Sequence, residues 1–421
     1  MSGFYWLQKS RGLVLFCLLL FSLQISAQDK RAPAYPLITH DPYFSIWSFS
    51  DTLSASPTRH WTGTPHSLLG MLKVDGQVYQ FMGEKEETYL PVLPAADEAP
   101  YKVSYTEQQP AINWMAESFD DGQWKQGEAP FGDHSLAKTK WLSRDLWVRR
   151  TFTIDNPDIA NLYLKAMHDD NCEIYLNGEK IYSAELEMRY THRKLNKLLK
   201  KGENVLAAHV VNTGGASSLD FGLVKEQIDQ SEKPTKAIQR KVNVTATQTI
   251  YEFTCGNIDL TLTFTSPLLM NNLELLATPV SYVSAVVKST NGASHDVKLF
   301  LGASSIIATN LPTQVVAAQA YQSNGLTLLK VGTKEQPILQ KKGDDLRIDW
   351  GYFYVAAPQA AKAAQFISAI DDAVNSFKLG TSVSFSDKTE GKGFYLNTIL
   401  SLGKVSGSPK ETFLLLGYDD L

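Results

Sequence analysis

Cysteine is scarce in this chain, because its 421 residues contain only three. Cys17 lies in an apolar stretch near the start, which leaves Cys172 and Cys255 for the rest of the chain. Two cysteines in an exported protein could form a disulfide. These two fall in segments that we assign to different domains, so we predict two buried free thiols. The cysteines and histidines also lack zinc-site spacing, with His60 and His66 six residues apart, and we expect no metal site.

An excess of charge of either sign is also missing. The chain has 40 Lys and Arg residues against 44 Asp and Glu residues, a formal net charge of −4. Proteins that bind nucleic acid usually carry a strongly basic surface, so this balance argues against nucleic acid as a partner. By contrast, 43% of the residues are hydrophobic, which is enough to fill large cores and excludes global disorder.

Long hydrophobic runs are confined to the start of the sequence. Residues 12–23 are apolar, follow the positive residues Lys9 and Arg11, and precede a small-residue site at Ala27. This order is typical of a cleaved secretion signal, and we assign residues 1–27 to it. The alternative is a membrane anchor, but the run is too short to span a bilayer comfortably. We therefore predict a secreted, periplasmic or surface-associated protein without a membrane span after cleavage.

Familiar catalytic motifs are missing as well. The sequence has no Gly-x-Ser-x-Gly nucleophile turn and no glycine-rich phosphate loop. No nucleophile can be matched to a base, so the catalytic residues stay unknown, and we expect no cofactor.

What the sequence does contain is the alternation of a mainly β protein. In residues 258–264 every second side chain is apolar, which is the period of a strand with one buried face. Residues 348–354 repeat this pattern. One amphipathic helix is predicted near residues 358–379, because apolar residues recur at helical spacing between Pro358 and Gly380.

Two polar stretches divide the chain. Residues 94–110 are rich in Pro, Ala and acidic side chains, and residues 225–241 are charged with few apolar positions. They predict an amino-terminal β region over residues 28–110 and a self-contained β segment over residues 111–224. Residues 225–241 would then be a linker to a β-sandwich over residues 242–421.

The middle segment carries a series of short motifs that combine aromatic and turn-forming residues. They are residues 119–124, 129–132, 146–152, 173–178 and 220–223. In these motifs the segment resembles the galactose-binding-like jelly rolls that accompany the catalytic domains of many glycosidases. The resemblance implies that a jelly-roll β-sandwich interrupts the β-sandwich region. Asn177-Gly178 supports a hairpin here, because a tight primed turn requires positive φ angles.

The jelly-roll resemblance suggests where carbohydrate would bind. We expect an exposed ring at Trp141 and polar groups at Arg189 and His192 to form that site. The alternative is a spacer that braces its neighbours without binding sugar. Asp169, Asp170 and Asn171 could ligate calcium, but a turn before the next strand explains them as well and is preferred.

The regions on either side of the jelly roll carry longer motifs. They include residues 40–48, 59–63, 69–76, 250–253, 260–267, 343–351 and 417–420. This combination resembles the amino-terminal part of the glutaminase A-like family of exported microbial proteins. The resemblance implies that a helical barrel of the six-hairpin type follows Leu421 and is the partner of this chain. The chain would then be the non-catalytic portion of a secreted amidohydrolase that acts on a small-molecule amide. The apolar run at residues 413–416, so near the last residue, also favours a portion of a larger protein.

A candidate substrate site lies in the amino-terminal region. It consists of His40, Asp41, Arg59, His60 and Trp61. Imidazole, carboxylate, guanidinium and indole groups together suit a polar small molecule. The alternative is a seam between packed domains, since Asp before Pro also favours a turn. For the polar group at residues 344–349 we prefer a surface ion pair on a strand end.

Two other functions stay open. The chain could be the accessory carbohydrate-binding region of a secreted glycosidase, with a glycan as its ligand. It could also be a plain adhesion module, since function does not follow from fold.

Overall fold

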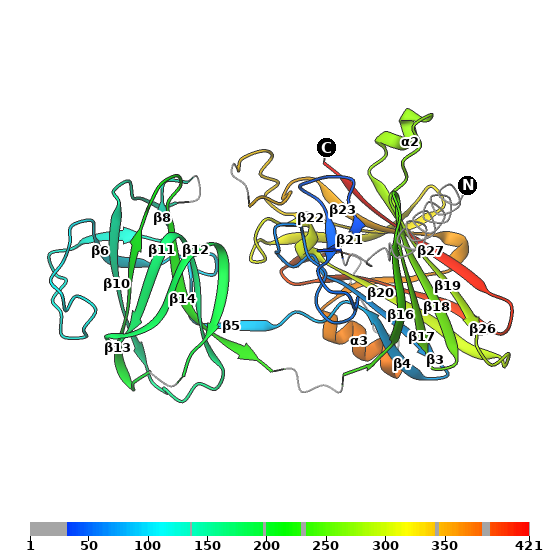
Figure 1. Cartoon of the computed structure of the whole chain (residues 1–421), viewed down its shortest axis with the longest axis horizontal. Coiled ribbons are helices and arrows are strands. Elements are labelled where there is room, and N and C mark those ends of the chain that lie inside the picture. The colour runs from blue at the N-terminus through cyan, green and yellow to red at the C-terminus, as the bar shows by residue number, and fades with distance from the viewer. Residues whose placement is uncertain are drawn as a thin grey trace, which may run out of the picture.

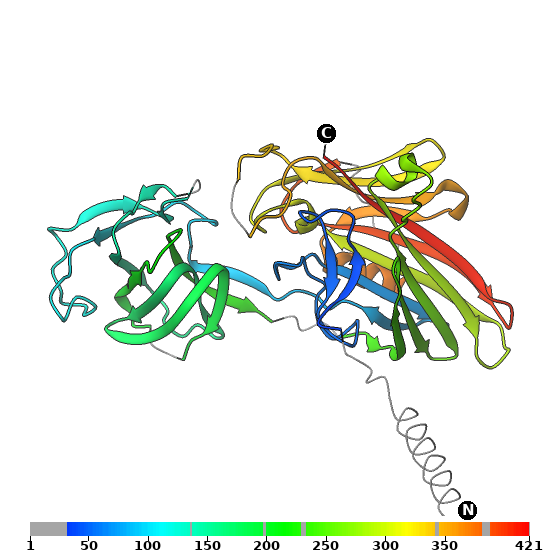
Figure 2. The same cartoon turned by 45° about the horizontal axis from the view of Figure 1, so that its top comes forward.

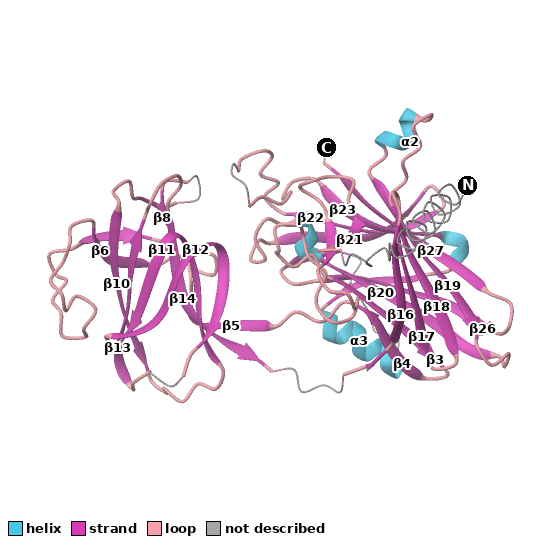
Figure 3. Cartoon of the chain, in the orientation of Figure 1, coloured by secondary structure: helices cyan, strands magenta, loops and turns pink. Residues whose placement is uncertain are grey.

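The computed structural model describes residues 32–134, 137–196, 199–228, 233–341, 345–380 and 388–420. Within these residues the chain is mainly β, as predicted, with a few short helices (Figure 3). The predicted secretion signal at residues 1–27 lies outside the described residues. Among the helices that are described, none is long and apolar enough to cross a membrane.

The chain forms two lobes (Figure 1). The ten-stranded lobe consists of one sheet in the order β7-β6-β10-β13-β11-β14-β8-β9, with β12 paired to β11 and β5 paired to β14. Its strands are β5 (Thr88–Leu93), β6 (Lys102–Thr106), β7 (Lys125–Glu128), β8 (Phe131–Gly132), β9 (Thr139–Lys140), β10 (Asp145–Ile154), β11 (Leu162–Leu176), β12 (Glu179–Lys194), β13 (Gly202–Val211) and β14 (Ser218–Gln227). Strands β5 and β6 belong to this lobe because they pair with β14 and β10. The lobe therefore begins before residue 111, which is the predicted start of the jelly roll.

The second lobe, the sandwich lobe, contains a six-stranded and a nine-stranded sheet. The six-stranded sheet has the order β15 (Thr235–Lys236), β4 (Gln77–Met82), β3 (Leu68–Val74), β20 (His295–Ser304), β26 (Tyr395–Val405), β24 (Ala364–Ser368). The nine-stranded sheet has the order β16 (Ile238–Val244), β17 (Gln248–Cys255), β18 (Ile258–Thr265), β19 (Val280–Ser289), β27 (Lys410–Asp419), β23 (Tyr352–Pro358), β22 (Leu326–Thr333), β21 (Val316–Ser323), β25 (Lys388–Gly391). A small sheet pairs β1 (Tyr35–Ile38) with β2 (Ile46–Ser48), and the helical segments are α2 (Leu273–Ala277), η1 (Ser305–Ala308), η2 (Gln359–Ala361) and α3 (Ile370–Leu379).

The six-stranded sheet is buried on both faces, which explains its nearly continuous apolar strands. On β3, Leu68 and Leu72 belong to the core shared with the nine-stranded sheet. Their neighbours Leu69 and Met71 belong to a second core, which α3 completes with Phe377. Successive side chains of a strand point to opposite faces, so a strand covered on both sides needs apolar residues at every position.

The ten-stranded lobe is inserted into the sandwich lobe. The chain leaves the sandwich lobe after β4 and returns at β15, which pairs in parallel with β4 through Thr235 and Tyr79. Exit and return therefore lie side by side on one sheet edge, and Figure 2 shows the inserted lobe beside the sandwich. The predicted fold class, a β-sandwich region interrupted by a second β unit, is confirmed.

Two local predictions are also confirmed, one of them with shorter bounds. Asn177 and Gly178 have φ angles of 52° and 84° and form the turn between β11 and β12. The amphipathic helix near 358–379 is present as α3, but it begins at Ile370. The Ala-rich residues before it pair with β26 as the edge strand β24, because that pairing buries Phe366 and Ile367.

The two thiols lie in separate cores, as predicted. Cys172 is buried in the ten-stranded lobe and Cys255 in the sandwich lobe, and both are free. Burial raises the pKa of both thiols, that of Cys255 to about 12, so both are kept as unreactive thiols at neutral pH.

Candidate functional site

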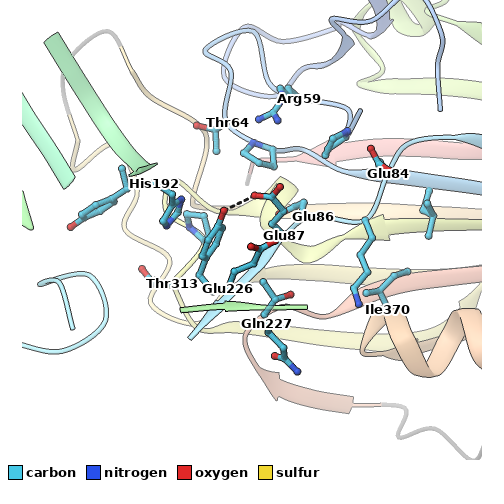
Figure 4. Close-up of a pocket in the computed structure, with 18 of the residues that line it drawn as sticks. Arg59, Thr64, Glu84, Glu86, Glu87, His192, Glu226, Gln227, Thr313 and Ile370 are labelled. Atoms are coloured by element: carbon cyan, nitrogen blue, oxygen red, sulfur yellow. Dashed lines mark hydrogen bonds between the residues drawn. The ribbon is translucent and has the colours of Figure 1, made fainter. Parts of the chain in front are cut away.

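A cavity of about 940 Å³ lies between the two lobes. Its wall combines the turn after Arg59, the connection before β5, strand β12 and helix α3 (Figure 4). Because the cavity draws side chains from both lobes, the insertion of the ten-stranded lobe is what creates it.

A tight turn at residues 60–64 forms the part of this wall that belongs to the sandwich lobe. The backbone N–H of His60 donates to the carbonyl of Thr64 over 2.8 Å, and that of Gly63 donates to the carbonyl of His60 over 2.8 Å. Arg59 donates from Nη1 to the carbonyl of Gly63 over 3.0 Å. Arg347 donates to the Thr62 hydroxyl over 3.0 Å and is itself buried. The turn is therefore held by the side chain of Arg59, which directly precedes it, and by that of Arg347, which is distant in the sequence.

Glu86 brings a carboxyl group to the cavity beside Arg59. The Ser67 hydroxyl donates to Glu86. Loss of water contact raises the pKa of Glu86, while the Ser67 hydrogen bond and the positive charge of Arg59 partly oppose this shift. A carboxyl group in this setting takes up a proton more readily than an exposed one. In the structure Glu86 accepts a hydrogen bond.

Aromatic rings line the side of the cavity formed by the ten-stranded lobe. The rings of Tyr89 and His192 stack with centroids 4.0 Å apart and an angle of 6° between their planes. The Tyr89 hydroxyl donates to Glu87 over 2.5 Å. Burial lowers the pKa of His192 to about 4, and nearby Lys165 contributes in the same direction. The imidazole is therefore neutral at neutral pH, which permits this close stack.

A buried charged network underlies the rings. Lys165 contacts Asp97 at 2.7 Å and Glu98 at 3.1 Å, and its ammonium lies 4.5 Å from the centre of the Tyr190 ring. Tyr190 in turn donates to Asp220. Four of these side chains, those of Asp97, Glu98, Lys165 and Tyr190, also line the cavity. Each of these side chains therefore has a charged or polar partner within the wall, which holds it in a defined position.

The structure brings together some of the residues that were predicted from sequence. Arg59, from the first candidate group, and Arg189 and His192, from the second, line the same cavity. Arg189 donates from Nη1 to the carbonyl of Thr62, so it reaches across from β12 to the sandwich lobe. Two groups that the sequence analysis assigned to separate sites thus contribute to one.

The other members of the first group lie outside this cavity. The carboxylate of Asp41 accepts from the backbone N–H groups of Tyr43 and Phe44 over 2.7 and 3.1 Å, which is the turn considered as an alternative. The ring of His60 is buried, with Nε2 3.0 Å from the Pro42 carbonyl. Trp61 is 49% exposed and donates to that same carbonyl over 2.7 Å.

His40 is the remaining member of the first group. Its Nδ1 lies 3.2 Å from the Ser281 hydroxyl, and burial lowers the pKa of the imidazole to about 4. The contact joins the first strands to β19, which is the packing role considered as an alternative.

Three expectations about the jelly roll and the strand ends were wrong. Trp141 is fully buried and donates to the Ser143 hydroxyl over 3.1 Å, because its ring fills the core of the ten-stranded lobe. Residues 169–171 lie within β11 and not in a turn. The ion pair between Arg347 and Asp345 is present at 2.6 Å, but Arg347 is buried and not at the surface. Asp344 lies outside the described residues.

Sequence reasoning missed Glu86, Glu87, Tyr89 and Lys165. A usable signal existed for Lys165, since a lysine within the apolar run of β11 needs a buried partner. No local signal pairs Glu86 with Arg59, because their approach depends on how the chain folds. Among the described residues, no group of three His, Cys, Asp or Glu side chains could hold a metal ion.

Comparison with known proteins gives two family matches. Residues 247–421 match a family described as a domain of unknown function, DUF5127, and residues 21–94 match another, DUF4964. No curated protein matches the chain.

Parts of the chain are similar to parts of several solved structures, three of which follow. The chain is similar to a glycosyl hydrolase family 2 member from Bacteroides cellulosilyticus DSM 14838, at 13% identity and a TM-score of 0.26, over 63% of this chain and 34% of that one. It is also similar to the Lactobacillus rhamnosus beta-glucuronidase, at 10% identity and a TM-score of 0.26, over 53% and 42%. A beta-glycosidase from Bacteroides vulgatus gives 10% identity and a TM-score of 0.25, over 67% and 34%. The chain thus spans about a third to two fifths of these proteins, and at such TM-scores the likeness carries no argument about function.

These comparisons correct the assignment made from sequence. The resemblance to the glutaminase A-like family is wrong by the family matches, because the families that match are DUF5127 and DUF4964, both described as domains of unknown function. The amidohydrolase activity was inferred from that resemblance, so it is no longer supported. The coarser description as a β-sandwich protein stands.

Proposed function

We propose that this chain binds carbohydrate in the cavity between its two lobes and serves as the binding region of a glycoside-processing protein. The observation that carries the proposal is the composition of that one cavity. Stacked rings, carboxyl groups and guanidinium groups converge there from both lobes.

The chemistry of these groups suits a sugar. A sugar presents C–H groups on the faces of its ring and hydroxyl groups around its edge. Rings such as Tyr89 and His192 offer apolar contact area, while Glu86, Glu87 and Arg59 offer hydrogen-bond acceptors and donors. A large cavity with a few convergent polar groups and shifted pKa values is the usual form of a ligand site.

Titration calorimetry of the full chain with a panel of neutral and acidic oligosaccharides tests the proposal. We expect at least one member to bind, and we expect Tyr89→Ala to weaken that binding about three- to tenfold through loss of its ring contacts. Tyr43→Ala is the matched control, because Tyr43 is 46% exposed and lies outside the cavity. A folded protein that binds no oligosaccharide of the panel would contradict the proposal, as would equal effects of the two variants.

A further inference from the structure

Two guanidinium groups from different lobes meet at one turn of the cavity wall. Arg59 donates to the carbonyl of Gly63, and Arg189 donates to the neighbouring carbonyl of Thr62. Each of these hydrogen bonds uses one end of its guanidinium group. Among the described residues, neither arginine side chain makes a further hydrogen bond or ion pair. Several N–H groups on each side chain therefore have no acceptor among the residues that the structure describes.

Gly63 leaves room for the guanidinium group of Arg189 at this turn. Its φ angle is +91°, in a region that side chains rarely permit. A Cβ atom at this position would lie 2.3 Å from Nη1 of Arg189, well inside van der Waals contact. The turn is thus shaped to admit the guanidinium group.

The two positive charges repel each other, although Glu86 and Glu87 lie nearby. Loss of water contact lowers the pKa of Arg59 most, Glu86 opposes this shift, and the smaller effects of Arg189 and Glu87 lower and raise the pKa respectively. Glu86 already accepts from Ser67, and Glu87 already accepts from Tyr89. A ligand oxyanion held between the two arginines would relieve the repulsion and take up their free donors.

We propose that Arg59 and Arg189 together bind an oxyanion substituent, a carboxylate or a sulfate, of the carbohydrate ligand. This inference rests on the proposed function and narrows the ligand to an acidic sugar. A guanidinium group matches the two oxygens of a carboxylate or sulfate through parallel N–H donors, which a lysine cannot reproduce. A site made from both lobes would also hold the lobes together when it is filled.

Three ligands of equal length test the inference on the full chain by titration calorimetry: an oligogalacturonide, a sulfated galactan oligosaccharide and a neutral galactan oligosaccharide. We expect the acidic ligands to bind at least tenfold more tightly than the neutral one. Tight binding of both acidic ligands identifies shared oxyanion recognition, and tight binding of one identifies the substituent. Their affinity should also fall with added NaCl, while that of the neutral ligand should not.

Variants then assign the effect to the arginines. Arg189→Gln should weaken the binding of the acidic ligands about tenfold, which is the usual loss for a charge-assisted hydrogen bond. It should change the affinity for the neutral ligand less than twofold. Arg59→Lys should give a similar selective loss while keeping the charge. Arg144→Gln is the control, since Arg144 is 77% exposed and lies outside the cavity. Circular dichroism would verify that each variant is folded.

The outcomes separate the two proposals. Binding of the neutral ligand without any preference for acidic ones overturns this inference and leaves the proposed function in place. Equal losses for neutral and acidic ligands in Arg189→Gln overturn it as well. Failure of all three ligands to bind a folded protein overturns both.

Discussion

Asp169 shows how a single side chain can give the ten-stranded lobe a pH dependence. It lies on β11, is 6% exposed, and neighbours Asp170, which accepts from the backbone N–H and hydroxyl of Thr213. Burial raises the pKa of Asp169 from 3.8 to about 7, and Asp170 adds to the shift. Asp170 keeps its charge because Thr213 stabilises it, so the proton is held by Asp169.

The direction of the effect on stability follows from linkage. Asp169 takes up a proton more readily in the folded chain than in the unfolded chain, so its contribution is fully present below pH 3.8 and is lost as the pH rises to about 7. Asp169→Asn removes this dependence. We expect the free energy of unfolding of the variant, relative to the natural chain, to rise by roughly 2 kcal/mol between pH 4 and pH 7 and then to level off.

Urea unfolding at several pH values measures this difference. Asp155→Asn is the control, because Asp155 is an exposed aspartate in the same lobe. The prediction would be contradicted if the free energy of unfolding of Asp169→Asn and of the natural chain differed by the same amount at every pH from 4 to 7.

At the scale of elements, helix α3 depends on a lysine from a distant strand. The helix ends at Gly380, which has a φ angle of 71° and donates its N–H to the carbonyl of Ser376. Lys73 on β3 donates from Nζ to the last carbonyls, those of Phe377 at 3.2 Å and Lys378 at 2.8 Å. A positive charge at this end also complements the helix dipole. The same helix forms part of the cavity wall, so its ending position affects the site.

Replacing Lys73 by methionine should loosen this helix. Lys73→Met keeps the apolar stem and removes the charge and both hydrogen bonds, so we expect a loss of about 1–2 kcal/mol in stability. Thermal unfolding followed by circular dichroism measures it. Lys288→Met is the control, since Lys288 is exposed on β19 and its side chain makes no hydrogen bond or ion pair among the described residues. Equal melting temperatures for the two variants would rule out the capping role.

At the scale of the whole molecule, the two lobes have separate hydrophobic cores. The core of the ten-stranded lobe contains Leu206, and the core between the two sheets of the sandwich lobe contains Leu262. Both side chains are 0% exposed. The lobes touch through the polar cavity wall, where contacts such as Arg189 to Thr62 add little cooperative energy.

We therefore expect calorimetry to show two unfolding transitions. Leu206→Ala should lower the temperature of one transition and Leu262→Ala that of the other. Each variant should reduce the free energy of unfolding of its lobe by roughly 3 kcal/mol, the usual cost of a large core truncation. Each variant is the control for its partner, because both delete the same atoms. A single transition that both variants shift equally would show that the lobes unfold as one unit. An oligosaccharide bound between the lobes should raise both transitions.

The sequence by itself determined the local elements. The alternation in residues 258–264 fixed strand β18, because a strand with one buried face requires it. Asn177-Gly178 fixed the hairpin between β11 and β12, because both residues tolerate positive φ. The apolar spacing before Gly380 likewise fixed α3, although it could not show that the residues ahead of it would form an edge strand.

Only the tertiary structure decided which side chains share a site. Arg59 and Arg189 lie far apart in the sequence and meet because the ten-stranded lobe is inserted between β4 and β15. Trp141 looked like an exposed binding ring until packing placed it in a core. Local patterns report the period and turn preferences of neighbouring residues, whereas burial and the meeting of distant charges depend on how the sheets pack together.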